Sequence, residues 1–166
     1  MARVARIKPK ESVVYHLVSR TVGQDFYLGD VEKDQFVRLL KDLNTRYFIN
    51  IYTFCLMSNH FHIVARVEAA DAVSDEAVRA RLAKWRGGPF AGVAANVVKY
   101  KAKWTDVSEF MKELKQTFSR WYNRRKRRTG YLWGDRFKSV ILGDDRAVKA
   151  TYVLGQPAYV RGKSQS

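Results

Sequence analysis

Two of the three histidines in the chain, His60 and His62, are separated by one residue in the run LMSNHFHIV. If this run is a β-strand, side chains two positions apart point to the same face, so both imidazoles can reach one ion while Phe61 and Ile63 point the other way. The alternative is a pair of half-exposed strand histidines that bind nothing. The spacing alone allows a metal site without establishing one.

The ligands near this pair bear on which metal it would hold. Zinc usually takes more imidazole or thiolate ligands, and the single cysteine, Cys55, lies on the other side of the expected turn. Two neutral nitrogens, completed by an amide or carboxylate oxygen and by water, leave positions open for phosphate oxygens. The pair therefore favours Mg²⁺ or Mn²⁺ in a phosphoryl-transfer site.

A candidate nucleophile lies near the end of the sequence. Tyr152 and Gln156 are four positions apart on a helix expected to begin at Asp144 or Asp145 and to stop at Pro157, so they share a face. A helix laid across a sheet could bring both to the histidines. A tyrosine hydroxyl, with a pKa near ~10, needs help from a metal or a base to attack at neutral pH. The alternative is an ordinary core or surface tyrosine.

The elements that must position these residues follow the order β, α, β, β, α, β, α. This order predicts an α+β, ferredoxin-like fold, in which a split βαβ antiparallel sheet carries helices on one face and a C-terminal helix holds the tyrosine. Asp106 and Glu109 form a variant capping box ahead of the clearest helix. The expected strands are 12–22, 48–57, 60–67 and 136–142, with Ser58 and Asn59 as the break between the second and the third. The expected helices are 30–47, 106–122 and 144–156.

One stretch fits this plan poorly. Residues 69–105 separate the third strand from its helix by far more than a usual connection. They contain a helix-like DEAVRARLAKW, the turn signal GGPF and a basic KYKAK. We therefore expect a single domain over residues 1–166, with an insertion at about 69–105 that has local structure of its own.

The charge of the chain points to a polyanionic partner. Thirty-one Lys and Arg against 16 Asp and Glu give a net charge of +15 on 166 residues, and neutralising phosphates releases their counterions. Charge alone does not distinguish DNA, RNA and anionic lipid. No apolar run approaches the roughly 20 residues of a membrane span, and no apolar signal core follows the basic start. We expect a soluble cytoplasmic protein without a membrane partner.

The basic residues gather at the end of the 106–122 helix and in the following YLWGDRFKS, where aromatic and basic residues alternate. Such a mixture can stack unpaired bases and bind their backbone. The alternatives are a solvated helix end and, for Trp133 and Phe137, packing under the sheet. Arg20 could reach a scissile phosphate if its strand neighbours the histidine strand, and His16 is expected to support the site rather than bind the ion. The predicted DNA-binding residues are Arg20, Arg120, Arg124, Arg125, Lys126, Arg127, Arg128, Tyr131, Trp133, Arg136 and Lys138.

Four segments together resemble the REP-associated tyrosine transposases, which are bacterial relatives of the single-tyrosine HUH transposases. They are YHLVSR, CLMSNHFHIV, FMKELKQTFSRWYNRRKRRTGYLWGDRFKS and YVLGQP, and they occur in the family's order. Two features depart from the family pattern. Gln156 and Pro157 stand where an asparagine and a proline are typical, although glutamine offers the same carbonyl oxygen, and residues 69–105 have no counterpart in the pattern.

The resemblance implies an enzyme that cleaves single-stranded DNA beside a hairpin. In such enzymes two histidines and an amide bind a divalent ion, and the tyrosine attacks the phosphate to leave a 5′-phosphotyrosine and a free 3′-hydroxyl. On this chain, the ligands would be His60, His62 and Gln156, and the nucleophile would be Tyr152. The alternatives are a hairpin DNA-binding or RNA-binding protein of the same fold without catalysis. We expect a monomer, with a dimer as the alternative.

Overall fold

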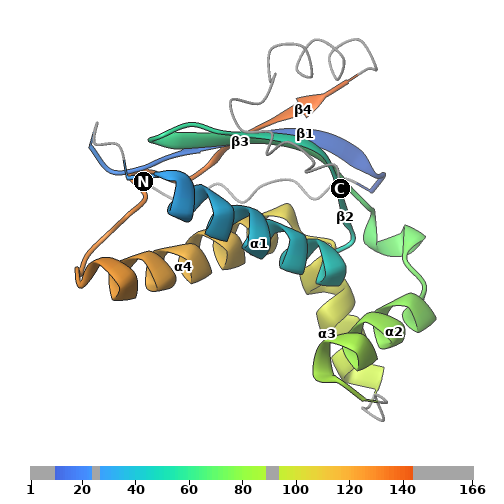
Figure 1. Cartoon of the computed structure of the whole chain (residues 1–166). Coiled ribbons are helices and arrows are strands. Elements are labelled where there is room, and N and C mark those ends of the chain that lie inside the picture. The colour runs from blue at the N-terminus through green and yellow to red at the C-terminus, as the bar shows by residue number, and fades with distance from the viewer. Residues whose placement is uncertain (1–9, 24–26, 89–93, 144–166) are drawn as a thin grey trace, which may run out of the picture.

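The computed structural model describes residues 10–23, 27–88 and 94–143 (Figure 1). The predicted order of strands and helices is confirmed over these residues, and two further helices lie between the third strand and its helix. The predicted last helix, with Tyr152 and Gln156, lies outside the described residues. The elements are β1 (Val13–Arg20), α1 (Asp30–Arg46), β2 (Ile49–Leu56), β3 (His60–Val67), a 3-10 turn (Ala70–Ala72), α2 (Asp75–Arg86), α3 (Ala94–Trp104), α4 (Val107–Lys126) and β4 (Lys138–Leu142).

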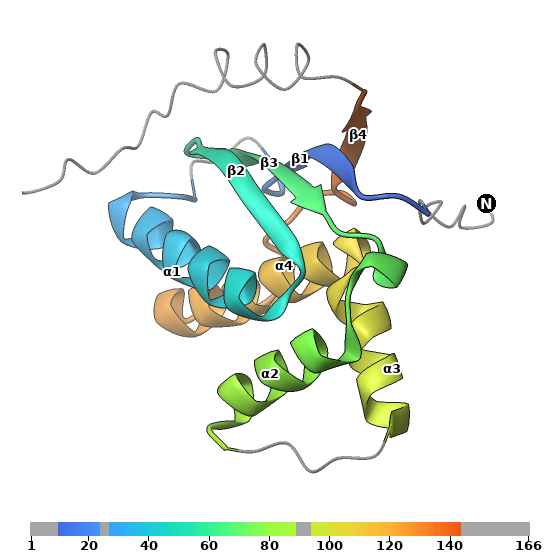
Figure 2. The ribbon, with the colours of Figure 1, turned by 90° about the vertical axis from the view of Figure 1, so that its right-hand side faces the viewer.

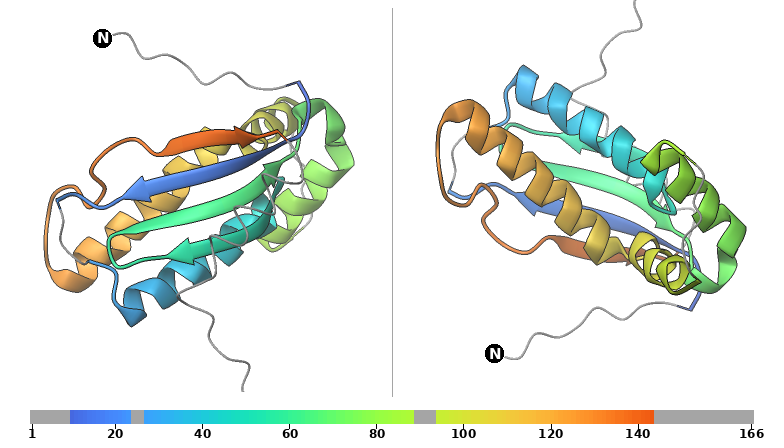
Figure 3. Two further views of the ribbon diagram at one scale, coloured as in Figure 1. Left: turned by 90° about the horizontal axis from the view of Figure 1, so that it is seen from above. Right: turned by 90° about the horizontal axis from the view of Figure 1, so that it is seen from below.

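The four strands form one antiparallel sheet in the order β2-β3-β1-β4. This order places the two strands that are central in space at positions one and three of the sequence, as in the predicted ferredoxin-like fold. Helices α1 and α4 cover one face of the sheet, and no described helix covers the other face (Figure 3). We call this second face the open face.

The core lies between the sheet and the two helices. Strand residues that alternate toward the helices are fully buried, among them Leu17, Phe61 and Ile63. They pack against Phe36 of α1 and Phe118 of α4, whose rings lie 5.4 Å apart. Because strand side chains alternate between faces, the neighbours of these core residues must point to the open face.

Helix α4 begins where the sequence predicts. The Asp106 carboxylate accepts hydrogen bonds from the backbone N–H groups of Ser108 at 2.7 Å and Glu109 at 3.4 Å. A capping carboxylate of this kind stabilises a helix by about 1 kcal/mol. The helix ends at Arg127, which adopts a left-handed conformation with φ 49°. Glycine usually takes this position because a Cβ strains it.

The predicted insertion contains α2 and α3, which lie beyond the ends of α1 and α4 and away from the sheet (Figure 2). Ser74 caps α2 through its hydroxyl, and Gly87 ends it with φ 76°. Trp104 is buried at the end of α3, where its ring packs on those of Trp85 and Tyr100. The helix-like DEAVRARLAKW is thus confirmed as a helix, and the basic KYKAK belongs to α3.

A carboxylate on α4 ties three helices together. Glu113 accepts a 2.7 Å hydrogen bond from the Tyr47 hydroxyl and forms ion pairs with Arg46 of α1 at 2.7 Å and Lys103 of α3 at 2.9 Å. Burial alone would raise the pKa of Glu113, but these hydrogen bonds and positive charges offset it, so the pKa is lowered. Burial and the same carboxylate raise the pKa of Tyr47.

Among the described helices, none is long and apolar enough to cross a membrane.

Candidate active site

The two histidines of the H-x-H motif lie side by side on the open face of β3. Phe61 between them is fully buried on the other face, as the alternation predicts. Strand β1 runs antiparallel beside β3, with Arg20 opposite His60 and Val18 opposite His62. Residues directly opposite each other share a face. The strand of Arg20 therefore neighbours the histidine strand, which is the arrangement that would let Arg20 reach a phosphate bound there. Its side chain is exposed on the same face as the histidines.

Two hydrogen bonds hold the rings by their Nδ1 atoms. His60 Nδ1 lies 2.7 Å from the side-chain oxygen of Asn59, to which an Nδ1–H donates. His62 Nδ1 lies 2.9 Å from Nε2 of His16 on β1. The ring centres of His60 and His62 are 5.2 Å apart. Both contacts leave Nε2 of His60 and of His62 for a ligand.

The direction of the second hydrogen bond decides whether His62 can bind an ion. A ligating ring nitrogen must carry a lone pair, so its partner nitrogen carries the proton and donates it to an acceptor. For Nε2 of His62 to bind, its Nδ1–H must donate to Nε2 of His16. In that tautomer His16 is the acceptor that fixes the ring, which is the supporting role expected for it.

The site keeps these imidazoles uncharged. Burial lowers the pKa of His16, His60 and His62 below the ordinary value of 6.5. The neighbouring rings lower the pKa of His62 further, and the positive charge of Arg20 acts on both His60 and His62. All three rings are therefore neutral at pH 7, and neutral imidazole is the form that binds metal.

The residues that the structure describes offer at most two nitrogen ligands to a metal ion. Two free Nε2 atoms on one face fit a divalent ion that takes its remaining ligands from elsewhere. Within residues 10–23, 27–88 and 94–143, no group of three or more His, Cys, Asp or Glu side chains is arranged to hold an ion. The amide predicted as a third ligand, Gln156, and the predicted nucleophile, Tyr152, lie outside the described residues.

Two exposed cations flank the histidines. Lys138 on β4 lies opposite Val18 of β1, which lies opposite His62, so these three residues form one row across the open face. Arg20 lies two residues after Val18 on β1, on the same face and opposite His60. Both cations are exposed, so the open face offers two positive charges next to two neutral nitrogens. This combination suits an anionic ligand such as a phosphodiester.

In the predicted basic cluster at the end of α4, two cations lie near a carboxylate and one packs over an aromatic ring. Lys126 Nζ lies 3.1 Å, and Arg125 Nε 3.8 Å, from the buried carboxylate of Glu32 on α1. Arg128 packs over the ring of Tyr27 at 5.0 Å and donates to a backbone oxygen. The remaining cations, Arg120, Arg124 and Arg127, are exposed on and just beyond the same helix.

The aromatic residues after α4 have different surroundings. Tyr131 is 87% exposed, whereas Trp133 and Phe137 are each 9% exposed. Trp133 packs against the ring of Phe61 at 5.4 Å, and its Nε1 donates to the Lys115 carbonyl at 3.0 Å. The alternative of packing under the sheet therefore holds for Trp133 and Phe137, and base stacking by Trp133 stays a prediction. Arg136 and Lys138 are exposed.

Two contributors to the site escaped the sequence analysis. Asn59 was read only as a break between strands, although it adjoins His60 and its amide could have been recognised as a partner. Glu32 was not among the predicted site residues, although it faces the basic end of α4. The second contact depends on how α1 and α4 pack, which no local pattern reveals.

The chain is similar to known proteins in part of its sequence and in its fold. Residues 9–81 match the family model described as IS200-like transposases, a stretch that includes the three histidines and Arg20. A structure of a REP-associated tyrosine transposase bound to a REP hairpin aligns with 93% of this chain and 73% of its own, with a TM-score of 0.57 and 11% identity. A candidate transposase from Deinococcus radiodurans aligns over 95% of this chain and all of its own, with a TM-score of 0.45 and 16% identity.

No curated protein matches the sequence. At 11% identity, the likeness to the REP-associated enzyme shows the fold, and the family match supplies the sequence relation over β1 to α2. The resemblance predicted from the sequence is thereby supported: residues 9–81 are similar to the IS200-like transposase family, and the fold is similar to that of a REP-associated tyrosine transposase.

Proposed function

We propose that this chain is a metal-dependent single-stranded DNA endonuclease and strand transferase that recognises hairpins of repeat elements and cleaves beside them. The observation that carries the proposal is the pair of neutral imidazoles on the open face, each with Nε2 left free, between the exposed cations Arg20 and Lys138. The hairpin bound by the structural relative supports hairpin DNA as the partner.

The described residues have distinct roles in this proposal. His60 and His62 would hold Mg²⁺ or Mn²⁺ through Nε2, with Gln156 as a third ligand. Such an ion, when bound, polarises a phosphate and stabilises the charge that develops on it. Arg20 and Lys138 bind the phosphate oxygens and orient the DNA backbone over the histidines. The basic end of α4 adds affinity for the backbone without reading sequence.

Tyr152 is the proposed nucleophile. Its oxygen forms a bond to the scissile phosphorus while the hydroxyl proton passes to water. The bond from phosphorus to the 3′ oxygen breaks, and that oxygen takes up a proton. The products are a 5′-phosphotyrosine and a free 3′-hydroxyl. Because a phosphodiester replaces a phosphodiester, another 3′-hydroxyl can reverse the step and join strands without ATP, as strand transfer requires.

A cleavage assay with separately labelled ends tests the proposal. Hairpin DNA with unpaired flanks is incubated with the protein and Mn²⁺ or Mg²⁺, and the products are resolved on a denaturing gel. A label at the 3′ end should move into a protein-bound band, while a label at the 5′ end should appear in a shortened, protein-free fragment. The opposite assignment would mean that the enzyme forms a 3′ linkage.

Matched variants identify the residues responsible. Tyr152→Phe should abolish the adduct, whereas Tyr159→Phe, seven positions further along the same segment, should leave it unchanged. His60→Ala should abolish cleavage and alter hairpin affinity in EDTA by less than about threefold, because the phosphate-binding cations remain. Equal loss of cleavage and binding would show that His60 is structural. Hairpin binding by the wild-type chain with no cleavage in either ion would establish the non-catalytic alternative.

We further propose that the protein acts as a monomer. The expected sedimentation behaviour is that of a single 19.2 kDa chain at concentrations where cleavage is measured. A dimer that alone carries the activity would contradict this.

A further inference from the structure

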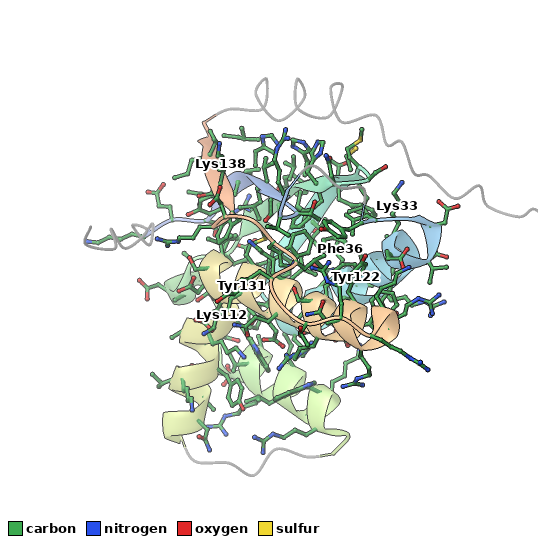
Figure 4. All side chains as sticks on the ribbon, turned by 90° about the vertical axis from the view of Figure 1, so that its left-hand side faces the viewer. Lys33, Phe36, Lys112, Tyr122, Tyr131 and Lys138 are labelled. Atoms are coloured by element: carbon green, nitrogen blue, oxygen red, sulfur yellow. The ribbon has the colours of Figure 1, made fainter. Side chains whose placement is uncertain are left out.

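A groove of about 790 Å³ lies on the helical side of the molecule, between α4 and residues 130–137 that follow it. Its apolar floor is formed by Leu132, Trp133 and Phe137, which also belong to the core. Lys112, Lys115, Arg120 and Arg136 line it as well, and no carboxylate does. Figure 4 shows Lys112 and Tyr131 close to each other beside α4, apart from Lys138 on the sheet.

Tyr131 stands out at this groove because its ring is exposed while the backbone on both sides is fixed. Asn123 donates from its amide to the Gly130 carbonyl at 3.0 Å, and Arg128 donates to the Tyr131 carbonyl at 3.3 Å. On the other side, the Leu132 carbonyl accepts from the N–H of Val22 at 2.8 Å. An aromatic ring that is 87% exposed on a fixed backbone can stack on a flat ligand without first being ordered.

The groove is connected to the candidate active site through the backbone. The N–H of Gly134 donates to the carbonyl of Arg20 at 3.1 Å, and Thr21 bridges to Trp133. Arg20 in turn lies opposite His60. The segment that carries Tyr131 is therefore attached to the end of β1 that flanks the histidines. A nucleic acid strand that passes Arg20 can continue around this end of β1 toward the groove.

We propose that this groove binds an unpaired nucleotide of the DNA substrate, with its base stacked on Tyr131 and its phosphate contacting Arg120 and Arg136. An apolar floor with a cationic lining and an exposed aromatic ring suits a base with an attached phosphate. The inference rests on the proposed function only in taking DNA as the ligand. It adds a second binding site, on the face of the sheet opposite to the histidines.

Binding measurements on two hairpins test the groove separately from catalysis. One hairpin is blunt and the other carries four unpaired nucleotides on each side, and both are titrated in EDTA so that no cleavage occurs. Tyr131→Ala should weaken binding of the flanked hairpin by about 5- to 150-fold, the range expected for loss of one stacked base. It should change binding of the blunt hairpin by less than twofold, and Tyr131→Phe should restore the affinity.

Trp85→Ala serves as the matched control, since Trp85 is another exposed aromatic, 46% accessible on α2 and outside the groove. It should leave both affinities unchanged in protein that keeps its melting temperature. Arg120→Gln and Arg136→Gln should each lower the slope of log Kd against log salt by about 0.7 for the flanked hairpin. Equal effects of Tyr131→Ala on the two hairpins, or none on either, would overturn the proposal and leave the groove to a ligand other than unpaired DNA.

Crosslinking gives a readout that does not depend on affinity. Iodouracil placed in the flank should crosslink to the tryptic peptide of residues 129–136, which holds Tyr131. Crosslinks confined to other peptides would refute the site. If the protein does not cleave DNA but shows the predicted affinity loss and crosslink, the proposed nuclease function is wrong and the proposed groove site stands. If the protein cleaves DNA but shows neither the affinity loss nor the crosslink, only the groove site is wrong.

Discussion

Replacing His16 with leucine tests whether this residue orients His62 for an ion. The change removes the acceptor 2.9 Å from His62 Nδ1 and keeps an apolar side chain of similar size on β1. A neutral hydrogen bond contributes about 1 kcal/mol, or about fivefold in affinity. Loss of the fixed ring position and proton adds to this, so we expect Mn²⁺ to bind about 10- to 100-fold more weakly, as when other supporting partners of metal ligands are removed.

The assay measures Mn²⁺ affinity without turnover. Free Mn²⁺ is followed by its electron paramagnetic resonance signal during titration of hairpin-bound protein, in a Tyr152→Phe background that prevents cleavage. His16→Gln should recover most of the affinity, because a glutamine carbonyl can accept from His62 Nδ1–H. Val140→Ala is the control, since Val140 is the exposed β4 partner of His16 on the same face. An affinity within twofold of the parent for His16→Leu, in folded protein, would refute the assigned role.

Three further predictions concern stability and DNA affinity. Glu113→Gln should lower the free energy of unfolding by about 1–3 kcal/mol at pH 7, because it weakens charged hydrogen bonds. The pKa of Glu113 is lowered in the folded state, so the difference in unfolding free energy between wild type and variant should reach its full size above pH 4.5. It should vanish as the pH falls through the folded-state pKa. A difference that persists in acid would contradict this role of Glu113. Arg127→Gly should raise the unfolding free energy by up to about 1 kcal/mol in a urea titration, because glycine adopts the left-handed conformation of residue 127 without strain from a Cβ. The same change should weaken hairpin binding in an anisotropy titration, because it removes a positive charge. Arg124→Gln should reduce the salt dependence of hairpin binding more than Lys126→Gln, because Lys126 is paired with Glu32; equal slopes would show that the ion pair opens on binding.

The parts of the fold that could be predicted from sequence are those that local patterns encode. Alternation of core and open-face residues around Phe61 placed both histidines on one face, and the carboxylate of Asp106 marked the start of α4. Helix α3 was missed because its stability comes from packing of Val97 and Trp104 against other helices rather than from a cap or a strong period.

The site was predictable in its residue types and less so in its contacts. The hydrogen bond between His16 and His62 depends on the register of β1 against β3, which places residues 46 positions apart within 2.9 Å. Trp133 was ambiguous because a tryptophan among cations suits both base stacking and a core that borders a basic surface. Its contacts with Phe36, Phe61 and Phe118 decide for the core.

Identification of the residue that joins covalently to DNA tests the proposed mechanism most directly. After reaction with hairpin DNA, nuclease and trypsin digestion should leave a nucleotide on the peptide of residues 150–161, which contains both Tyr152 and Tyr159. Fragmentation in the mass spectrometer separates the two. We predict a phosphate ester on Tyr152 that is absent from His60→Ala protein. A nucleotide on Tyr159, on a residue outside this peptide, or on no residue in protein that cleaves DNA would contradict the mechanism.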